Sequence, residues 1–415
     1  MNLPQPFLLG TPITERHHML RVTLRSLRGQ LSVRRSTFGI SCSYDPHYES
    51  SDERSQRIGY QTIFKPDYST AADELESGLV AGAKVSWADS STFRLKRRAI
   101  LQWDSGRPTT ILIIKKPGDE AATKELKDLG AWLKHHGLTV AVERAVAHSE
   151  APDFEVYDPL AHPIDLAITL GGDGTVLHLA SLFKEDAPMP PVVSFAMGTL
   201  GFLTPFKTSM ARTVLSRLLW PPWEGEPVFA TLRSRKQCEV HWGGKSQRVH
   251  RVLNECTIDR GASPQVVMLE TFVDGQHVTT VHADSLIIAT PSGSTAYSMS
   301  AGGPMVAPSV PCTLITPVAP HSLSFRPIVV PETAVIEVHL PESARSNSAR
   351  ASFDGRHTVR LRKGSSVVCR ASRYALPMIT MHPLDEDWYE GITAKLKWTG
   401  SLRHQPRFDD HATRG

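Results

Sequence analysis

The sequence predicts an α/β N-terminal domain with a mainly parallel sheet, a β-rich C-terminal domain, and a C-terminal helix that packs back on the first domain. Two observations predict this arrangement. Between residues 107 and 220, apolar β-type runs alternate with helical patterns, which is typical of a parallel sheet covered by helices on both faces. From residue 228 to about residue 373, short β-type runs separated by turns replace the helical periodicity, which predicts an all-β domain.

The first domain begins with a continuous apolar run at Thr109–Ile114, which is typical of a strand covered on both faces. A helix is predicted over Glu120–His135, because apolar residues recur there on one helical face. Further strands are predicted at Leu138–Val142, Ile164–Leu170 and Pro191–Ala196, and a further helix at Val176–Phe183.

The turn Gly171–Thr175, with the sequence Gly-Gly-Asp-Gly-Thr, is the most informative part of the chain. It follows a predicted strand and precedes a helix, so it lies where ligands bind in parallel sheets. Its glycines let backbone approach a ligand closely, and the N–H groups at a helix N-terminus favour phosphate. Two common nucleotide motifs are absent, since no G-x-x-x-x-G-K-[ST] sequence occurs and Leu177 replaces the third glycine of G-x-G-x-x-G.

Asp173 puts a carboxylate where phosphate groups would lie, although the two negative charges repel each other. Three roles are open for it. It could cap the following helix, bind a metal ion, or take a proton from a hydroxyl group that attacks phosphorus. The turn alone does not choose among these roles.

The second domain is predicted from its β-type runs and turns. Turn sequences occur at Asp274-Gly275 and Asp354-Gly355. A helical pattern returns at Asp385–Trp398, where apolar residues recur every four positions. The strand-like runs are Gln265–Val273, Leu286–Ala289, Ala334–Leu340 and Val359–Leu361.

A second candidate site lies more than a hundred residues after the first. An apolar run breaks at Thr290-Pro291 into small hydroxylic and glycine residues, and Tyr297 follows. Small residues let the backbone approach a ligand, and a tyrosine offers a ring face with a polar tip. The alternative interpretation is a Ser/Gly-rich surface loop.

The basic charge of the chain is local. Residues 1–40 hold six arginines, no lysine and one acid, so their formal net charge is +5. The whole chain has a formal net charge of +4, so the remaining residues together carry −1. Nucleic-acid binding is therefore not predicted. Leu20, Leu24, Leu27 and Leu31 have helical spacing among these arginines, which is typical of a mitochondrial transit peptide. A basic tail or a partner-binding helix is the alternative.

The remaining composition is that of a globular protein, with 40% hydrophobic and 21% charged residues. No run approaches the roughly 18 apolar residues of a membrane helix, so no membrane partner is expected. The cysteines form no C-x-x-C pair, so neither a disulfide framework nor a zinc site is predicted, and a reducing compartment fits. They are Cys42, Cys238, Cys256, Cys312 and Cys369.

Taken together, these motifs resemble the NAD kinase family, and they occur in the family's order. The residues that carry the resemblance are Gly171–Thr175, Phe195–Leu203, Asn254-Glu255, Thr290–Pro304, Pro320–Pro327 and Ser352–Gly355. Gln102-Trp103, Lys115–Pro117, Asp387-Trp388 and the arginine-rich N-terminus look most like the fungal mitochondrial NADH kinase type.

The resemblance implies a kinase that transfers the γ-phosphate of ATP to the 2′-hydroxyl of the adenosine ribose of NADH or NAD, with Asp173 as the general base. It implies Mg²⁺ carried by ATP without dedicated protein ligands, a homo-oligomer, and a place in the mitochondrial matrix, with the cytoplasm as the alternative. The implied substrate- and nucleotide-binding residues are Gly171, Gly172, Gly174, Thr175, Asn254, Glu255, Asp284, Ser294, Thr295, Ala296, Tyr297, Ser298, Ser300, Asp354 and Arg356.

Composition, charge and periodicity divide the chain into segments, and the resemblance implies that the β-rich segment binds the dinucleotide. Residues 1–40 are expected to be the transit peptide, 41–104 a variable or partly disordered connector, and 105–220 the α/β domain. Residues 221–375 are expected to form the β-rich dinucleotide-binding domain, 376–400 a return segment with its helix, and 401–415 a loose tail.

Some positions depart from the family pattern or leave alternatives open. Ser285 replaces the usual glycine and Ser292 the commoner threonine, and both substitutions are expected to preserve function. His282 and Arg356 could influence the choice between NAD and NADH, or could be plain surface residues. The rival functions are a lipid or sugar kinase of the wider GGDG superfamily and a non-catalytic NAD(H)-binding sensor.

Overall fold

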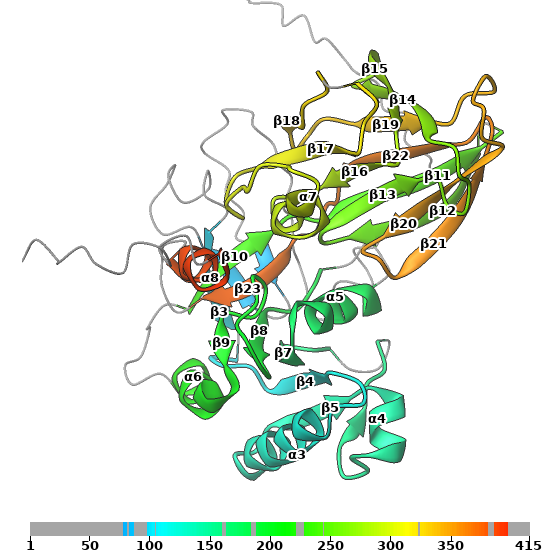
Figure 1. Ribbon diagram of the computed structural model, residues 1–415. Helices are drawn as coiled ribbons and strands as arrows, with labels where there is room; N and C mark the ends of the chain where they lie inside the picture. The colour runs from blue at the N-terminus through cyan, green and yellow to red at the C-terminus, as the bar shows by residue number, and fades with distance from the viewer. Residues whose placement is uncertain are drawn as a thin grey trace, which may run out of the picture. The chain divides into compact units, whose positions relative to one another are not determined.

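The computed structural model describes residues 78–80, 83–86, 98–103, 105–159, 163–183, 188–220, 228–243, 245–322, 324–380 and 386–396. The predictions for residues 1–40 and 401–415 lie outside this part of the chain. Figure 1 shows the described elements, with α3–α6 around one sheet and the strands between residues 236 and 371 in two further sheets.

An eleven-stranded sheet forms the first domain, in the order β1-β2-β3-β10-β23-β8-β7-β4-β5-β6, with β9 paired to β8. The strands from β4 to β9 pair in parallel, as the sequence predicts. They are β4 (Thr110–Lys115), β5 (Thr139–Val142), β6 (Glu155–Val156), β7 (Leu166–Gly171), β8 (Val192–Ala196) and β9 (Phe206–Lys207).

Helices cover both faces of this sheet, which explains why its central strands β4, β7 and β8 are almost entirely buried. Leu166, Ile168 and Leu170 of β7 pack into one core with α3 and α6. Ala167 of the same strand faces a second core with α5. The helices are α3 (Glu120–His135), α4 (Arg144–Ser149), α5 (Asp173–Leu182) and α6 (Ala211–Leu219), with the short η1 (Thr208–Met210) before α6.

The strand order places a ligand crevice at the end of β7. From β4 the chain proceeds through β5 and β6 on one side, then returns to β7 and β8 on the other side of β4. Ligands of open α/β sheets bind at the carboxyl ends of the two strands that flank such a reversal. Those ends are Lys115 of β4 and Gly171 of β7.

The first sheet also receives strands from outside residues 105–220. They are β1 (Gly78–Val80), β2 (Ala83–Ser86), β3 (Arg98–Trp103), β10 (Val228–Arg233) and β23 (Leu376–Thr380). The first three lie in the segment that we expected to be a connector, and β10 lies in the segment that we assigned to the β-rich domain. Their pairing partners are distant in sequence, with Met378 of β23 beside Val192 of β8, so no local pattern could assign them. The predicted domain limits stay predictions.

Two six-stranded antiparallel sheets form the second domain, in the orders β12-β11-β22-β19-β14-β15 and β18-β17-β16-β13-β20-β21. Buried residues of both sheets share one core, so the sheets pack face to face. The strands of the first of these sheets are β11 (Lys236–Trp242), β12 (Lys245–Val252), β14 (Val267–Val273), β15 (Gln276–Ala283), β19 (Ile336–His339) and β22 (Ser366–Ala371).

The other sheet carries the second candidate site at the end of one of its strands. A short helical segment, η2 (Ser292–Thr295) and α7 (Tyr297–Ser300), follows β16. The strands of this sheet are β13 (Glu255–Asp259), β16 (Ser285–Ala289), β17 (Cys312–Val318), β18 (Ile328–Pro331), β20 (Ser348–Phe353) and β21 (His357–Arg362).

The C-terminal helix α8 (Glu386–Leu396) packs back on the first domain, as predicted. Its Trp388 and Ile392 bury themselves against Phe202 of the segment between β8 and β9. The predicted fold class is therefore confirmed. None of the described helices is long and apolar enough to cross a membrane.

Candidate active site

The Gly-Gly-Asp-Gly turn joins β7 to α5 at the ligand-binding edge of the sheet. Gly171 ends β7, and Gly172 is the N-cap residue of α5. Only glycine fits at position 171, because an added Cβ would lie 2.1 Å from the Oγ1 atom of Thr175 and 3.2 Å from Cβ of Lys116. Thr175 is buried and donates its backbone N–H to the carbonyl of Gly172 at 2.8 Å, which closes the turn.

Gly172 and Gly174 have open space in place of a side chain. An added Cβ at either position would meet no atom within 4 Å among the described residues. Protein packing therefore does not explain why these positions hold glycine. The first N–H groups of the ten-residue helix α5 lack intrahelical partners, so this space is suited to the oxygens of a phosphate group.

Asp173 is the first residue of α5, and its carboxylate turns toward the loop after β8. The Oδ2 atom accepts the backbone N–H of Phe202 at 3.0 Å, and Oδ1 accepts that of Leu203 at 3.0 Å. The hydroxyl of Thr204 donates to Oδ1 at 3.3 Å. Asp173 makes no capping bond to its own helix, so the helix-cap role is wrong.

The loop closes around this carboxylate so tightly that it requires glycine at position 201. A Cβ at that position would lie 1.8 Å from Oδ1 of Asp173. The ammonium group of Lys395 in α8 lies 3.6 Å from Oδ2 of Asp173 and 4.2 Å from the ring centre of Phe202. These donors keep the carboxylate in one orientation, and its side chain stays partly exposed.

The second half of the site lies at the start of β13, and the carboxylate of Asp354 holds it in place. This carboxylate accepts the backbone N–H groups of Leu253 at 2.8 Å, Asn254 at 2.8 Å and Glu255 at 3.1 Å. Asp354 itself has φ 49°, a left-handed conformation, within the turn between β20 and β21. Burial raises its pKa, although the three N–H donors oppose that shift. The sequence suggested Asp354 as a ligand contact, but the structure uses its carboxylate to hold the start of β13.

Asn254 and Glu255 present buried acceptors that the chain does not satisfy. Oδ1 of Asn254 and Oε2 of Glu255 have no hydrogen-bond partner among the described residues. Burial of the Glu255 carboxyl, with the nearby charge of Asp354, raises its pKa to about 8. An unpaired buried polar atom costs roughly 1–3 kcal/mol, so these two oxygens indicate a ligand that forms hydrogen bonds with them.

The turn after β16 packs directly on this pair. The backbone N–H of Thr290 donates to the carbonyl of Asn254 at 2.9 Å, and its hydroxyl donates to the carbonyl of Leu253 at 2.5 Å. Only glycine fits at position 293, because an added Cβ would lie 2.2 Å from the carbonyl oxygen of Asn254. The sequence interpretation as a surface loop is therefore wrong for this turn.

The candidate binding residues of this turn divide into two groups. Ser294 and Ser298 are fully buried, and their hydroxyls bond to the backbone of Val306 and to the hydroxyl of Thr316. These two serines hold the turn in place. Thr295, Ala296, Tyr297 and Ser300 lie on its accessible side, where Tyr297 is a large exposed aromatic residue.

A chain of contacts joins the two halves of the site. Arg356, in the turn after β20, donates to the carbonyl of Gly174 at 2.6 Å and approaches Nδ1 of His178 at 3.2 Å. Nε2 of His178 lies 2.7 Å from a carboxylate oxygen of Glu143. Because arginine can only donate, Nδ1 of His178 accepts and Nε2 carries the proton that bonds to Glu143. Arg356 therefore contacts the Asp173 turn.

Sequence reasoning missed Arg233, His178 and Glu143. Arg233 of β10 is buried, and its guanidinium donates to the carbonyl of Phe202 at 3.2 Å and to the hydroxyl of Ser292 at 3.3 Å. It thus ties the loop around Asp173 to the turn after β16. An arginine within an apolar strand is the one sequence feature that could have pointed to Arg233. Its partners are 31 and 59 residues away in the sequence, so they could not be found from the local pattern.

Asp284 is separated from the other candidate residues within this chain. It precedes β16, whereas Thr290 follows β16, so a five-residue strand of about 3.4 Å per residue lies between them. Its Oδ1 atom pairs with the guanidinium of Arg260 at 2.8 Å. The structure therefore does not bring Asp284 to the Asp173 turn of the same chain.

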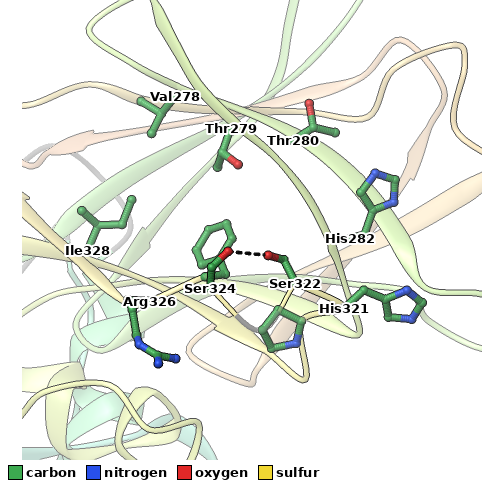
Figure 2. A pocket seen from close by; sticks show the side chains of 11 residues that line it. Val278, Thr279, Thr280, His282, His321, Ser322, Ser324, Arg326 and Ile328 are labelled. Carbon is green, nitrogen blue, oxygen red and sulfur yellow. Dashed lines mark hydrogen bonds between the residues drawn. The ribbon is translucent and has the colours of Figure 1, made fainter.

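His282 lies at a cavity apart from the Gly-Gly-Asp-Gly turn. The cavity has a volume of about 620 Å³ and lies between β15 and the segment from Pro320 to Ile328. Figure 2 shows His282 and His321 together at one side of it and Arg326 at another. The backbone of His321 donates to the carbonyl of His282 at 2.8 Å, which fixes this wall of the cavity.

Comparisons with known proteins bear on both domains. Residues 111–221 match the ATP-NAD kinase N-terminal domain, and residues 253–381 match the ATP-NAD kinase C-terminal domain. The chain is similar to NADH kinase pos5, mitochondrial, of Schizosaccharomyces pombe, with 35% identity over 72% of this chain and 77% of that protein. It is also similar to NAD kinase 2, chloroplastic, of Arabidopsis thaliana, with 39% identity over 74% of this chain and 32% of that protein.

The chain covers only part of several relatives. It spans 65% and 61% of the length of two rice relatives and about a third of the Arabidopsis protein. Among solved structures, it resembles the crystal structure of yeast NADH kinase complexed with NADH, with a TM-score of 0.68 and 30% identity. That match covers 80% of this chain and 98% of the yeast chain.

Proposed function

Because the chain belongs to the ATP-NAD kinase family, we propose that it transfers the γ-phosphate of ATP to the 2′-hydroxyl of the adenosine ribose of NADH or NAD. Two features of the site carry this proposal. An oriented carboxylate on Asp173 lies at the helix N-terminus beside open space at Gly172 and Gly174, and unsatisfied acceptors on Asn254 and Glu255 lie at the start of β13.

Asp173 is the proposed general base. An alcohol is a weak nucleophile at neutral pH, and a positioned base contributes roughly 10²–10⁴-fold to such a reaction. The bonds from Phe202 and Leu203 point the carboxylate in one direction, so the ribose hydroxyl need only be brought within hydrogen-bonding distance of it. The N-terminus of α5 and the open space at Gly174 would hold the phosphates.

Mg²⁺ fits this site as a partner of ATP. Mg²⁺ prefers oxygen ligands in octahedral geometry and is often held by substrate phosphates and water with few protein ligands. Both carboxylate oxygens of Asp173 already accept hydrogen bonds from the loop after β8, which supports an ion carried by ATP. When bound, the ion would neutralise charge on the phosphates.

Asn254, Glu255 and the turn after β16 are the proposed dinucleotide side. Ribose hydroxyls and amino groups donate hydrogen bonds, and the unsatisfied oxygens of Asn254 and Glu255 can accept them. Tyr297 offers an exposed ring for stacking. Arg356 would hold the two halves of the site together through Gly174.

The test is direct. Purified chain is incubated with ATP, Mg²⁺ and either NADH or NAD, and NADP(H) is measured with an NADP-specific dehydrogenase. We expect NADP(H) to form, and the ratio of the two rates measures the acceptor preference. Phosphorylation of a lipid or sugar without NADP(H) would establish the rival kinase, and NADH binding without turnover would establish the sensor.

The mitochondrial matrix is the proposed location, with the cytoplasm as the alternative. The arginine-rich residues 1–40 support it, and one relative carries the word mitochondrial in its name. The N-terminal sequence of the chain from fractionated cells tests it. A chain that still starts at Met1 in the cytosol would contradict import. A homo-oligomer is also proposed, and light scattering of the purified chain measures its mass.

A further inference from the structure

Three cysteines that are far apart in the sequence meet in the core of the second domain. The sulfur atoms of Cys238, Cys256 and Cys369 all lie within 4.8 Å of one another. Those of Cys238 and Cys369 are 3.5 Å apart. All three side chains are fully buried, in the core that the two six-stranded sheets share. We call these residues the thiol cluster.

The cluster bridges the two sheets. Cys238 of β11 and Cys369 of β22 are direct partners on neighbouring strands of one sheet. Cys256 belongs to β13 in the other sheet, where it follows Glu255. Three thiols from three strands therefore converge on one point between the sheets.

We propose that the thiol cluster is a trigonal binding site for one soft monovalent cation of the Cu(I) class. Thiolate ligands select such ions. If the metal–sulfur bonds are about 2.3 Å, the value for zinc thiolates, a planar three-coordinate site has sulfur atoms about 4 Å apart. The sulfur separations in the cluster, from 3.5 Å to at most 4.8 Å, bracket that value.

The ligand count favours Cu(I) over zinc and over iron–sulfur clusters. Structural zinc sites take four ligands, and [4Fe–4S] or [2Fe–2S] clusters also take four. Among the described residues, this cluster is the one group of His, Cys, Asp and Glu side chains whose donor atoms lie close enough to hold an ion, and it has three members. A disulfide would use only Cys238 and Cys369 and would leave Cys256 without a role.

A buried lysine lies close to the cluster in the fold. The thiol of Cys369 donates toward the sulfur of Cys238. Lys236 is buried two residues before Cys238 on β11, so both side chains lie on the same face of that strand. Binding of Cu⁺ would displace the thiol protons of the three cysteines, and the Lys236 ammonium would offset part of the resulting negative charge.

The experiment uses the reduced full-length chain under anaerobic conditions. Cu(I) is supplied as its coloured complex with bicinchoninate, and loss of the colour reports transfer to the protein. A second arm produces the chain in cells grown with added copper and measures the metal after purification, so that slow entry into a buried site does not limit binding. We expect one copper per chain in at least one arm, with three sulfur neighbours in X-ray absorption spectra.

Matched variants separate the cluster from other thiols. Cys256→Ala and Cys369→Ala should each lose the bound copper while keeping the circular dichroism spectrum of the parent. Cys312→Ala removes a buried cysteine that belongs to another core, so it should retain one copper. Absence of copper in both arms, retention of copper by well-folded Cys256→Ala, or a site with fewer than three sulfur neighbours would overturn the proposal.

Discussion

Asp173 illustrates how one side chain is fixed by partners that are remote in sequence. Its two oxygens accept N–H groups from residues 29 and 30 positions later, and the ammonium of Lys395 lies beside them. These hydrogen bonds hold the carboxylate in one orientation. A general base needs such a fixed orientation, because it must lie within hydrogen-bonding reach of the proton that it takes.

Replacing the carboxylate by an amide tests its chemistry. Asp173→Asn should lower turnover by roughly 10²–10⁴-fold, because an amide cannot take up a proton, and binding of NADH should change little. Initial rates and fluorescence titration with NADH measure the two effects. Asp128→Asn, on an exposed position of α3, is the control and should match the parent. Equal turnover in Asp173→Asn would exclude the base role.

The close packing of the Gly201 backbone against the Asp173 carboxylate gives a second prediction. Gly201→Ala would place a methyl group 1.8 Å from Oδ1 of Asp173, so the carboxylate or the loop must move. Misplacement by about 1 Å can cost on the order of 100-fold in rate, and a drop of that size is expected in steady-state assays. Gly198→Ala meets no atom within 4 Å among the described residues and serves as the control.

Glu255 makes stability depend on pH. Its pKa in the folded chain is about 8, above its ordinary value of 4.5, so the folded state favours the protonated form. The stability that this group contributes is complete below pH 4.5 and is lost as pH rises through about 8. Thermal unfolding temperatures should therefore fall between pH 5 and 9. In Glu255→Gln this fall should be smaller, and an unchanged pH profile would contradict the raised pKa.

At the scale of elements, the two halves of the site meet through turns. The loop after β8 contacts α8 through Phe202, and the turn after β20 contacts α5 through Arg356. The N-terminus of α5 therefore receives contacts from both domains. Its position, and that of Asp173, depends on these contacts as well as on the glycines of its own turn.

The contact between Arg356 and His178 predicts coupling between two elements. Arg356→Ala and His178→Ala should each lower turnover, and the double variant should be less impaired than the product of the single effects. Residues in direct contact commonly show coupling of about 0.5–3 kcal/mol, measured here from kcat/KM. Arg360→Ala, at an exposed position of β21, should be additive with His178→Ala. Additivity of Arg356→Ala as well would exclude the coupling.

At the scale of the whole molecule, the two described domains are joined by two chain crossings and by a common hydrophobic core. Strands β10 and β23 of the first sheet flank the β-rich domain in sequence, so the chain passes from one domain to the other twice. Leu253, which precedes Asn254, packs in one core with Val176 and Leu179 of α5. Packing of this kind links the stability of one domain to that of the other.

Leu253→Ala tests this linkage. Removing a buried leucine typically costs about 2–5 kcal/mol, and the whole described region should lose stability together. Circular dichroism and tryptophan fluorescence should report one shared unfolding transition at a lower denaturant midpoint. Val329→Ala, at an exposed position of β18, is the control. Two separate transitions in the variant would show that the domains unfold independently.

The elements themselves were predictable from local patterns. The helix at Glu120–His135 was predicted with the limits that the structure has, and the strand before Gly171 within two residues. Strands and helices have periods of two and 3.6 residues, so a short stretch suffices to reveal them. The placement of β3, β10 and β23 in the first sheet was missed, because pairing partners are chosen across the whole chain.

By itself the sequence determined the fold class, the turn at the end of β7 and the residue types that could bind phosphate and ribose. Only the tertiary structure decided what Asp173 contacts, that Asp354 supports β13, that Asp284 lies apart, and that three cysteines meet. The physical reason is distance along the chain. Glycine turns and apolar periods act over a few residues, whereas the contacts of these side chains form when remote elements pack together.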